Sequence, residues 1–307
     1  MITLRQLRYF DALARHLHFG RAADECGISQ PALSQQIQEM EATLSLPLIE
    51  RGARRLALTP KGEEIARRAT RILGDVRDLT DFASQGGDVL SGTLKLGVIP
   101  SVAPYVLPKV LPLVHEAYPG LELHLRETRT DQLKQELVQG RLDVLLMALP
   151  SGDANLESRP LFVDRFLLAR RAGADDDAAA PASPDAIPPD RLLLLEEGHC
   201  LRDQALTYCG IQKSELQASF GSASLATIMQ MVANGYGVTL LPEICVDVEA
   251  RDRRIALSRF AEPEPQREIG LVWRRSSPRR SDFEALGDLV LAAMKTGQPA
   301  SPALANA

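Results

Sequence analysis

Long apolar runs and signal-like leaders are missing from this chain of 307 residues. No apolar stretch approaches the roughly 20 residues that a membrane-spanning helix needs. The N-terminus also lacks the uninterrupted apolar segment of a signal peptide. The sequence therefore predicts a cytoplasmic protein with no membrane contact, and it argues against a binding protein for export.

Cysteine is scarce as well, because four cysteines are too few for a structural disulfide framework in a chain of this size. In a reducing compartment, any bridge between them is more often transient or sensory. None stands in CxxC spacing, and no HExxH motif is present, so the sequence predicts neither a metal site nor a bound cofactor. The cysteines are Cys26, Cys200, Cys209 and Cys245.

Positive charge is also in short supply, since the net charge is −5. This balance argues against a protein that coats nucleic acid non-specifically, but it allows a specific DNA reader with a local positive face. Through residue 60, seven arginines exceed six acidic residues, so positive charge is modestly concentrated at the N-terminus. The chain length itself predicts two or three domains.

The first 60 residues have the pattern of a helix-turn-helix. An apolar stripe from Leu4 to Leu17 is followed by a short helix over residues 21–26, and Gly27 is placed to turn the chain. Ser29 reads as an N-cap, with Pro31 in the first turn of a second helix. Apolar residues of that helix face inward, which leaves a polar face that can hydrogen-bond to base edges in the major groove.

Residues 48–60 read as a short hairpin, or wing, whose arginines can contact phosphates or the minor groove. The alternative is a helical hairpin that packs against another element and never meets DNA. The residues predicted to contact DNA are Arg5, Gln30, Pro31, Ser34, Gln35, Gln38, Arg51, Arg54 and Arg55.

One continuous helix is predicted over residues 61–85, before a hinge at 86–88. Its apolar residues recur at three- and four-residue steps, which suits pairing with a second copy of the same helix. The alternative is that the helix lies on its own domain. The stripe consists of Ile65, Ala69, Ile72, Val76, Leu79 and Phe82.

After the hinge, short strands alternate with helices, which predicts a mostly parallel sheet with crossover helices. Ser101 and Thr130 each follow a strand and precede a helix, so they fall at the edge where ligand sites of such folds lie; each can also be a simple helix cap. Residues 173–189 read as a mobile surface loop, and the tail from residue 296 as disordered. The predicted strands are 93–99, 121–125, 143–147, 165–169, 192–195, 217–220, 238–241 and 270–273, and the helices are 105–118, 131–139, 200–209, 225–233 and 281–295.

Cys200 and Cys209 stand at the two ends of one predicted helix. Nine residues of helix separate their Cα atoms by ~13 Å, whereas a disulfide tolerates at most ~7 Å, so bridging requires the helix to unwind. Cys200 falls near a helix N-terminus, where the dipole favours an anion, and His199 and Arg202 are close enough to supply hydrogen bonds or positive charge. The alternative is that these cysteines are buried hydrophobes, as we expect for Cys26 and Cys245.

Several ordered segments resemble the LysR-type transcriptional regulators, and others resemble the hydrogen peroxide-sensing branch of that family. The LysR-type segments are Phe19-Gly20-Arg21-Ala22-Ala23, Ser29-Gln30-Pro31-Ala32-Leu33-Ser34 and Leu58-Thr59-Pro60-Lys61-Gly62. The peroxide-sensing branch is resembled by the run from Glu197 to Ala205, Gly97-Val98-Ile99-Pro100, Ser224-Leu225 and Thr239-Leu240-Leu241-Pro242.

The resemblance implies an α/β fold in which a winged helix-turn-helix and a linker helix precede a two-lobed regulatory domain like a periplasmic binding protein. It implies that Cys200 is the peroxidatic cysteine and Cys209 the resolving one. Ser101 takes a position where the family typically carries threonine. The implied domains are 1–60, 61–87 and 88–307, with lobe I at 88–162 and 268–297 and lobe II at 163–267. The residues expected at the peroxide site are Ser101, Thr130, His199, Arg202, Asp203 and Arg274.

We therefore expect a transcriptional activator that senses hydrogen peroxide through a reversible Cys200–Cys209 disulfide, and not an enzyme. The family implies a homotetramer on an interrupted palindromic operator in double-stranded DNA, with RNA polymerase as a further partner. One alternative is a LysR-type regulator that binds a small organic effector between the lobes. Another is a thiol peroxidase that uses the same two cysteines.

Overall fold

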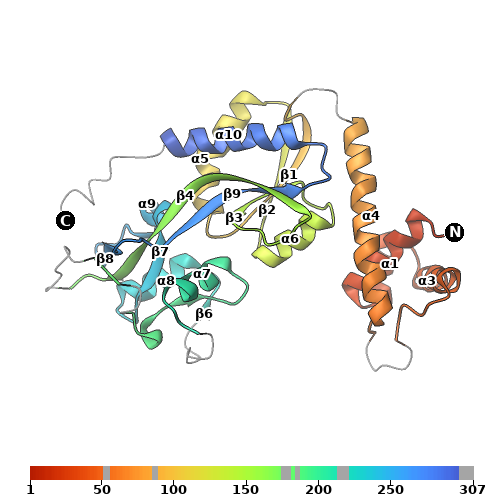
Figure 1. Ribbon diagram of the computed structural model, residues 1–307, viewed down its shortest axis with the longest axis horizontal. Coiled ribbons are helices and arrows are strands. Elements are labelled where there is room, and N and C mark those ends of the chain that lie inside the picture. The colour runs from red at the N-terminus through yellow and green to blue at the C-terminus, as the bar shows by residue number, and fades with distance from the viewer. Residues whose placement is uncertain (51–55, 85–88, 174–180, 184–186, 213–220, 297–307) are drawn as a thin grey trace. The chain divides into compact units, whose positions relative to one another are not determined.

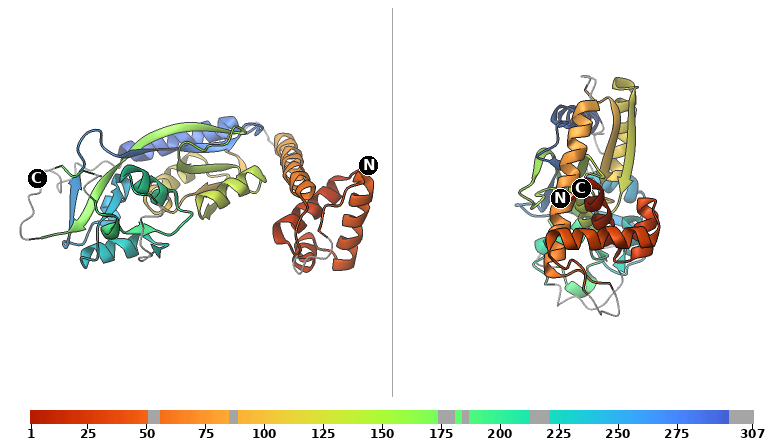
Figure 2. Two further views of the ribbon diagram at one scale, coloured as in Figure 1. Left: turned by 60° about the horizontal axis from the view of Figure 1, so that its bottom comes forward. Right: turned by 90° about the vertical axis from the view of Figure 1, so that its right-hand side faces the viewer.

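The computed structural model in Figures 1 and 2 describes residues 1–50, 56–84, 89–173, 181–183, 187–212 and 221–296. The chain forms two compact units: one of Met1–Gln85 with Val138–Arg141, and one of Gly86–Leu137 with Leu142–Ala307. No helix in the described ranges has the length and apolar content needed to cross a bilayer. Predictions that fall outside the described residues are those for Arg51, Arg54 and Arg55, the hinge at 86–88, the strand at 217–220, most of the 173–189 loop and the tail beyond 296.

Three helices and a wing precede α4 (Pro60–Ser84) in the N-terminal unit. Ser29 caps α3 as predicted, because its Oγ accepts the N–H of Ala32, and Gly27 turns the chain with φ +68°. Glu41 then joins α3 to the wing, since its Oε1 accepts the N–H groups of Leu48 (2.6 Å) and Ile49 (3.2 Å). Ile49 pairs with Leu58 across the hairpin. The helices are α1 (Leu4–His16), α2 (Phe19–Cys26) and α3 (Gln30–Leu44), and their buried core includes Phe10, Leu13, Ala22, Leu33, Ile37 and Met40.

Helix α4 (Pro60–Ser84) is continuous, as its sequence predicts. Its first half packs on the N-terminal unit: Ala69 is buried there, Ile65 is half-buried, and the Thr70 hydroxyl donates to Asp11 of α1 at 2.7 Å. The prediction that the whole apolar stripe serves a second copy is therefore wrong for Ile65 and Ala69, because α1 already covers them.

The second half of the α4 stripe is different. Ile72 is 39% exposed and Leu79 is 67% exposed. Val76 is half-buried, and the side chain of Phe82 lies outside the described residues. An apolar surface that continues along one helix therefore remains open to solvent at Ile72 and Leu79.

The second unit is built on a mixed sheet of seven strands in the order β2-β1-β3-β9-β4-β7, with β8 paired to β4. Strands β1, β2 and β3 are mutually parallel, whereas the β3–β9, β9–β4, β4–β7 and β4–β8 pairs are antiparallel. The prediction of a mostly parallel sheet is therefore wrong outside the first three strands. The strands are β1 (Gly92–Val98), β2 (Leu121–Glu127), β3 (Val144–Ala148), β4 (Leu156–Arg171), β7 (Thr239–Pro242), β8 (Ile255–Arg259) and β9 (Gln266–Arg274).

Strands β4 and β9 form one long ladder that runs the length of this unit (Figure 1), from the Leu156–Arg274 pair to the Arg165–Gln266 pair. A register shift interrupts it between Pro160 and Phe162, close to the predicted crossing point of the lobes. Helices α5 (Ala103–Ala117) and α10 (Arg280–Thr296) lie side by side against it. The ladder is thus a continuous framework that both halves of the unit share.

The remaining elements surround a second apolar core that includes Phe166, Val232, Leu241 and Cys245. A short parallel pair, β5 (Leu194–Leu195) with β6 (Gly221–Ser222), lies beside this core. Ile187 is buried in the core, so the predicted surface loop packs inward at that point. The helices here are α6 (Thr130–Val138), α7 (Cys200–Tyr208), α8 (Leu225–Ala233) and α9 (Val246–Glu249).

Candidate functional site

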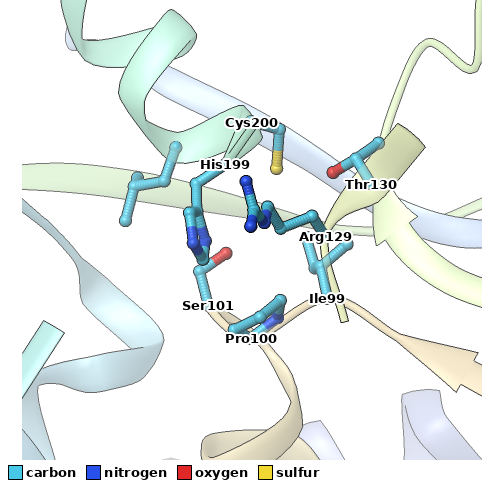
Figure 3. A pocket seen from close by; sticks show the side chains of 8 residues that line it. Ile99, Pro100, Ser101, Arg129, Thr130, His199 and Cys200 are labelled. Atoms are coloured by element: carbon cyan, nitrogen blue, oxygen red, sulfur yellow. The ribbon is translucent and has the colours of Figure 1, made fainter. Parts of the chain in front are cut away.

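Three chain segments meet in a small pocket around Cys200 (Figure 3). One is the end of β1 with Ser101, the second is the β2–α6 turn with Thr130, and the third is the turn that begins α7. Strands β1 and β2 are parallel neighbours, so their carboxyl ends meet at one edge of the sheet. The fold thereby brings together Ser101, Thr130, His199 and Cys200, as the sequence predicts.

Cys200 is half-buried and is the first residue of α7. Figure 3 shows its sulfur directed between the Thr130 hydroxyl and the Arg129 guanidinium. The N–H groups of a first helical turn lack partners within the helix, and the helix dipole there favours a negative charge. Cys200 therefore stands at the electropositive end of α7.

The Thr130 hydroxyl is the most informative polar group in the pocket. Thr130 is 9% exposed, and its Oγ1 is buried without a hydrogen-bond partner among the described residues. A buried hydroxyl without a hydrogen-bond partner destabilises the folded protein by about 1–3 kcal/mol. Because it faces the Cys200 sulfur, a small oxygen-bearing ligand between the two groups would satisfy it.

His199 lies in the pocket as predicted, but its imidazole does not carry the positive charge that the sequence suggested. Its side chain is 8% exposed, and burial, helped by the positive charge of Arg129, lowers the pKa of its imidazole. His199 is therefore neutral at pH 7. It can give or accept a hydrogen bond beside Cys200, but it does not supply the positive charge that the sequence suggested.

Arg267 donates hydrogen bonds to both the side chain and the backbone of Ser101. The sequence analysis did not identify Arg267 as a site residue. The Arg267 Nη1 donates to Ser101 Oγ at 2.9 Å, and its Nη2 donates to the Ser101 carbonyl at 3.1 Å. Its Nε donates to Asp164 at 2.8 Å, in an ion pair whose side chains are 1% and 0% exposed. Burial raises the pKa of the Asp164 carboxyl, while Arg267 and the Ile244 N–H favour its charged form.

Three predicted residues lie outside this pocket. Arg274 donates through Nη1 to the carbonyls of Leu137 and Leu142, at 2.8 Å each, so the prediction that it lines the site is wrong. Arg202 turns back along α7 and donates to the Leu195 carbonyl at 2.9 Å. Asp203 lines a neighbouring groove instead.

That groove has a volume of about 480 Å³ and shares Cys200 and Thr130 with the pocket. By contrast, the empty space of the pocket including its open side is only about 190 Å³, against about 1110 Å³ for the groove measured in the same way. The groove is large enough for a small organic molecule. Besides Cys200, Thr130 and Asp203, its lining includes Lys134, Gln204, Tyr208 and Arg267.

Cys209 follows α7 and is 6% exposed, within the apolar core. Its N–H donates to the Ala205 carbonyl at 3.0 Å, so the helix is intact up to this residue. The nine-residue separation from Cys200 then corresponds to ~13 Å between Cα atoms. All four cysteines are free thiols, with Cys245 fully buried as expected and Cys26 half-buried.

The second candidate surface is the outer face of α3. Gln30, Pro31, Gln35 and Gln38 are exposed there, and Ser34 is half-buried. Gln35 is held by Glu39 at 3.0 Å, and elsewhere on this unit Arg5 donates to the Tyr9 hydroxyl at 2.6 Å. In the described part of the chain, no three His, Cys, Asp or Glu side chains gather in a way that could hold a metal ion.

Comparison with known proteins places both units. Residues 4–63 match the profile of the bacterial regulatory helix-turn-helix proteins of the lysR family, and residues 87–295 match the LysR substrate binding domain. The DNA-binding transcriptional dual regulator OxyR of Escherichia coli K12 is 40% identical over 296 residues, which is 95% of this chain and 96% of that protein. A probable hydrogen peroxide-inducible genes activator of Streptomyces viridosporus is 43% identical over 295 residues, 95% of each chain.

Solved structures agree with this assignment. A full-length OxyR variant from Pseudomonas aeruginosa superimposes with a TM-score of 0.72 at 35% identity, covering 95% of this chain and 98% of that one. A hydrogen peroxide-bound OxyR mutant from Corynebacterium glutamicum gives a TM-score of 0.65 at 36% identity, covering 96% and 93%. The chain therefore belongs to the LysR family of bacterial helix-turn-helix regulators, and within it to the OxyR branch.

Proposed function

We propose that this chain is a transcription activator that responds to hydrogen peroxide through Cys200 and Cys209. Relatives at about 40% identity over nearly the whole chain are named activators of hydrogen peroxide-inducible genes. The pocket around Cys200 supports the same activity, because it offers a sulfur at a helix N-terminus and a buried hydroxyl opposite it.

In the first step, the Cys200 thiolate attacks one oxygen of hydrogen peroxide. A sulfur–oxygen bond forms, the oxygen–oxygen bond breaks, and the leaving hydroxide takes a proton to become water. In the second step, Cys209 attacks the sulfenic sulfur as a thiolate, and the hydroxyl leaves as water with the proton from Cys209. The product is a Cys200–Cys209 disulfide, which a thiol reductant returns to two thiols by exchange.

The single observation that carries the proposal is the unpartnered Thr130 hydroxyl facing Cys200. Peroxide is small, and each of its oxygens can donate and accept a hydrogen bond. The small size of the pocket favours peroxide over larger molecules. Ser101 and His199 then complete the set of groups around the reacting sulfur.

The disulfide acts on the fold through α7. A disulfide requires the Cα atoms of Cys200 and Cys209 to lie within ~7 Å of each other. The intact helix keeps them farther apart, so oxidation unwinds α7 and exposes the residues that pack against it. Arg202 and Asp203 are the predicted site residues that lie on α7 itself. Arg202 bonds to the Leu195 carbonyl, and this hydrogen bond would break when α7 unwinds. Asp203 stands in the same helix and moves with it.

On DNA, we propose that α3 enters the major groove and that the wing contacts phosphate. The readers are the exposed residues of α3 together with Arg5, and residues 1–60, 61–87 and 88–307 act as reader, linker and sensor. The exposed Ile72 and Leu79 support pairing of α4 with a second copy. Further pairing would give a homotetramer on an interrupted palindrome, from which the activator contacts RNA polymerase.

The decisive experiment adds one equivalent of hydrogen peroxide to the reduced protein, alkylates thiols within seconds, and maps disulfides by mass spectrometry. We expect a Cys200–Cys209 bridge, with Cys26 and Cys245 alkylated. A matched Cys26→Ser variant should behave like the wild type, because Cys26 is half-buried and ends α2 in the N-terminal unit. If Cys200 remains alkylated at full occupancy, the proposed mechanism is wrong.

One observation favours a second candidate, because the groove beside Cys200 has room for a small organic effector. Such an effector would raise the melting temperature of a Cys200→Ser variant and change its DNA binding without thiol chemistry. If the same cysteines instead served a thiol peroxidase, the protein would consume peroxide catalytically with a dithiol reductant. Stoichiometric consumption, together with peroxide-dependent DNA binding, would support the regulator.

A further inference from the structure

Arg129 occupies a position that neither the sequence motifs nor the proposed two-cysteine chemistry explains. It directly precedes Thr130 in the β2–α6 turn, and its exposed side chain reaches across the pocket. There its Nη1 donates to the Glu197 carbonyl at 3.1 Å. Figure 3 shows the guanidinium beside the Cys200 sulfur.

Arg129 lies against the turn that leads into Cys200. Gly198 has φ +93°, and a Cβ built there would lie 2.9 Å from Arg129 Cδ, so the arginine side chain passes close to this glycine. The Arg129 charge also contributes to the lowered pKa of His199. One side chain from the β2–α6 turn thus bonds the Glu197 carbonyl and lies close to Gly198.

We propose that Arg129 is a positioning residue that promotes oxidation of Cys200 by peroxide and opposes closure of the Cys200–Cys209 disulfide. This inference rests on the proposed function and deepens it. It assigns to one side chain the balance between the two steps, and hence how long the sulfenic acid persists before the protein changes shape.

The first step benefits because the positive charge of Arg129 lies beside the sulfur that carries the negative charge when it attacks peroxide, and opposite charges attract. Because Arg129 is exposed, solvent and salt screen part of this effect. We therefore expect loss of the charge to slow sulfenic acid formation a few-fold at low ionic strength, and less in high salt.

The second step is opposed because Cys200 must leave its place to meet Cys209. The Cα separation has to fall from ~13 Å to below ~7 Å, so the 197–199 turn moves and the Arg129–Glu197 hydrogen bond breaks. A charge-assisted hydrogen bond that is intact before this step and broken during it slows the step. Without Arg129, we expect the disulfide to form at least about threefold faster from the sulfenic acid.

The test compares Arg129→Gln and Arg129→Lys with a matched control, Arg126→Gln. Arg126 lies on β2 three residues before Arg129, is also exposed, and pairs with Glu136 at 3.4 Å instead of reaching the pocket. Each substitution is made in the full chain. The first step is measured as sulfenic acid formation with a Cys209→Ser background, and the second by rapid-quench disulfide mapping after one equivalent of peroxide.

We expect R129Q to slow the first step and accelerate the second, and R129K to recover the first step because it keeps the charge. R126Q should leave both rates within twofold of the wild type. A general loss of structure would change both steps in one direction, so this outcome overturns the inference. Equal behaviour of R129Q and R126Q overturns it as well.

The two proposals fail in distinguishable ways. If wild-type Cys200 does not react with peroxide, the proposed function falls, and this inference falls with it. If the wild type reacts but R129Q shows no opposite change in its two rates, the Arg129 inference alone is wrong. The contact itself is tested by proton NMR titration, because R129Q should raise the pKa of His199 whereas R126Q should not.

Discussion

The buried ion pair between Asp164 and Arg267 is expected to be the most sensitive single point in the second unit. Asp164 gives one oxygen to the Arg267 Nε at 2.8 Å and the other to the Ile244 N–H at 3.1 Å. In an Asp164→Ala variant, the Arg267 guanidinium would stay buried without its counter-charge, and the Ile244 N–H would lose its acceptor. The variant should also weaken the two hydrogen bonds by which Arg267 positions Ser101 in the Cys200 pocket.

The size of this effect follows from burial. Removing one partner of a buried pair typically destabilises a protein by about 3–5 kcal/mol. For a unit of this length, each kcal/mol lowers Tm by about 2–4 °C, so D164A should melt about 6–20 °C below the wild type. The matched control is Asp288→Ala, because Asp288 is 70% exposed in its pair with Arg159. There we expect a loss of at most about 1 kcal/mol.

The assay is urea and thermal unfolding followed by circular dichroism, with D164A/R267M as a third variant. Replacing both members of a buried pair by apolar groups is often close to neutral. The double variant should therefore recover most of the stability that D164A loses. If D164A and D288A unfold alike, or if the double variant is no more stable than D164A, the assigned role of the buried charge is wrong.

Three further predictions concern the pocket and the DNA-binding face. Thr130→Val should raise stability by about 1 kcal/mol, because it removes an unpartnered buried hydroxyl, and yet slow peroxide oxidation of Cys200 severalfold. Unfolding curves and stopped-flow oxidation measure the two effects, and a destabilised T130V would show that the hydroxyl has a partner. His199 has a lowered pKa in the folded state, so below the ordinary value of 6.5 the unfolded chain takes up the proton more readily and stability falls. His199→Gln should reduce the stability lost between pH 7.5 and 5.5 in urea titrations, and an unchanged loss would contradict the assignment. Gln38→Ala should weaken specific operator binding by about 1–3 kcal/mol in a fluorescence anisotropy titration, whereas equal weakening on unrelated DNA would refute base reading by this residue.

Local signals predicted most of what is local in this fold. The Ser29 cap and the Gly27 turn are read from a few neighbouring residues, and the structure confirms both. The same holds for Cys200 at the start of α7, because a strand, a glycine turn and a helix follow one another in the sequence. Features fixed by neighbours along the chain need no tertiary information.

Features fixed by distant segments were missed or misplaced. Arg267 and Arg274 stand on the same strand, but the register pairs Arg267 with Asp164 and Arg274 with Leu156, at opposite ends of the ladder. Nothing in the sequence tells which end reaches Cys200. Strand direction is equally non-local, so the antiparallel β9 was read as part of a parallel sheet. For Arg129 the sequence did contain a local signal, because Arg129 directly precedes Thr130, which was already predicted to lie at the site.

The distance that α7 keeps between its two thiols also bears on the reduction potential of the proposed disulfide. Forming the disulfide requires the helix to unwind, and the free energy of unwinding destabilises the oxidised protein relative to the reduced one. The disulfide is therefore easier to reduce. For a two-electron couple, about 1.4 kcal/mol corresponds to about 30 mV. An unwinding penalty of about 3 kcal/mol would therefore raise the potential by roughly 60 mV. The stability of a nine-residue helix would in this way set the oxidant level at which the protein changes state.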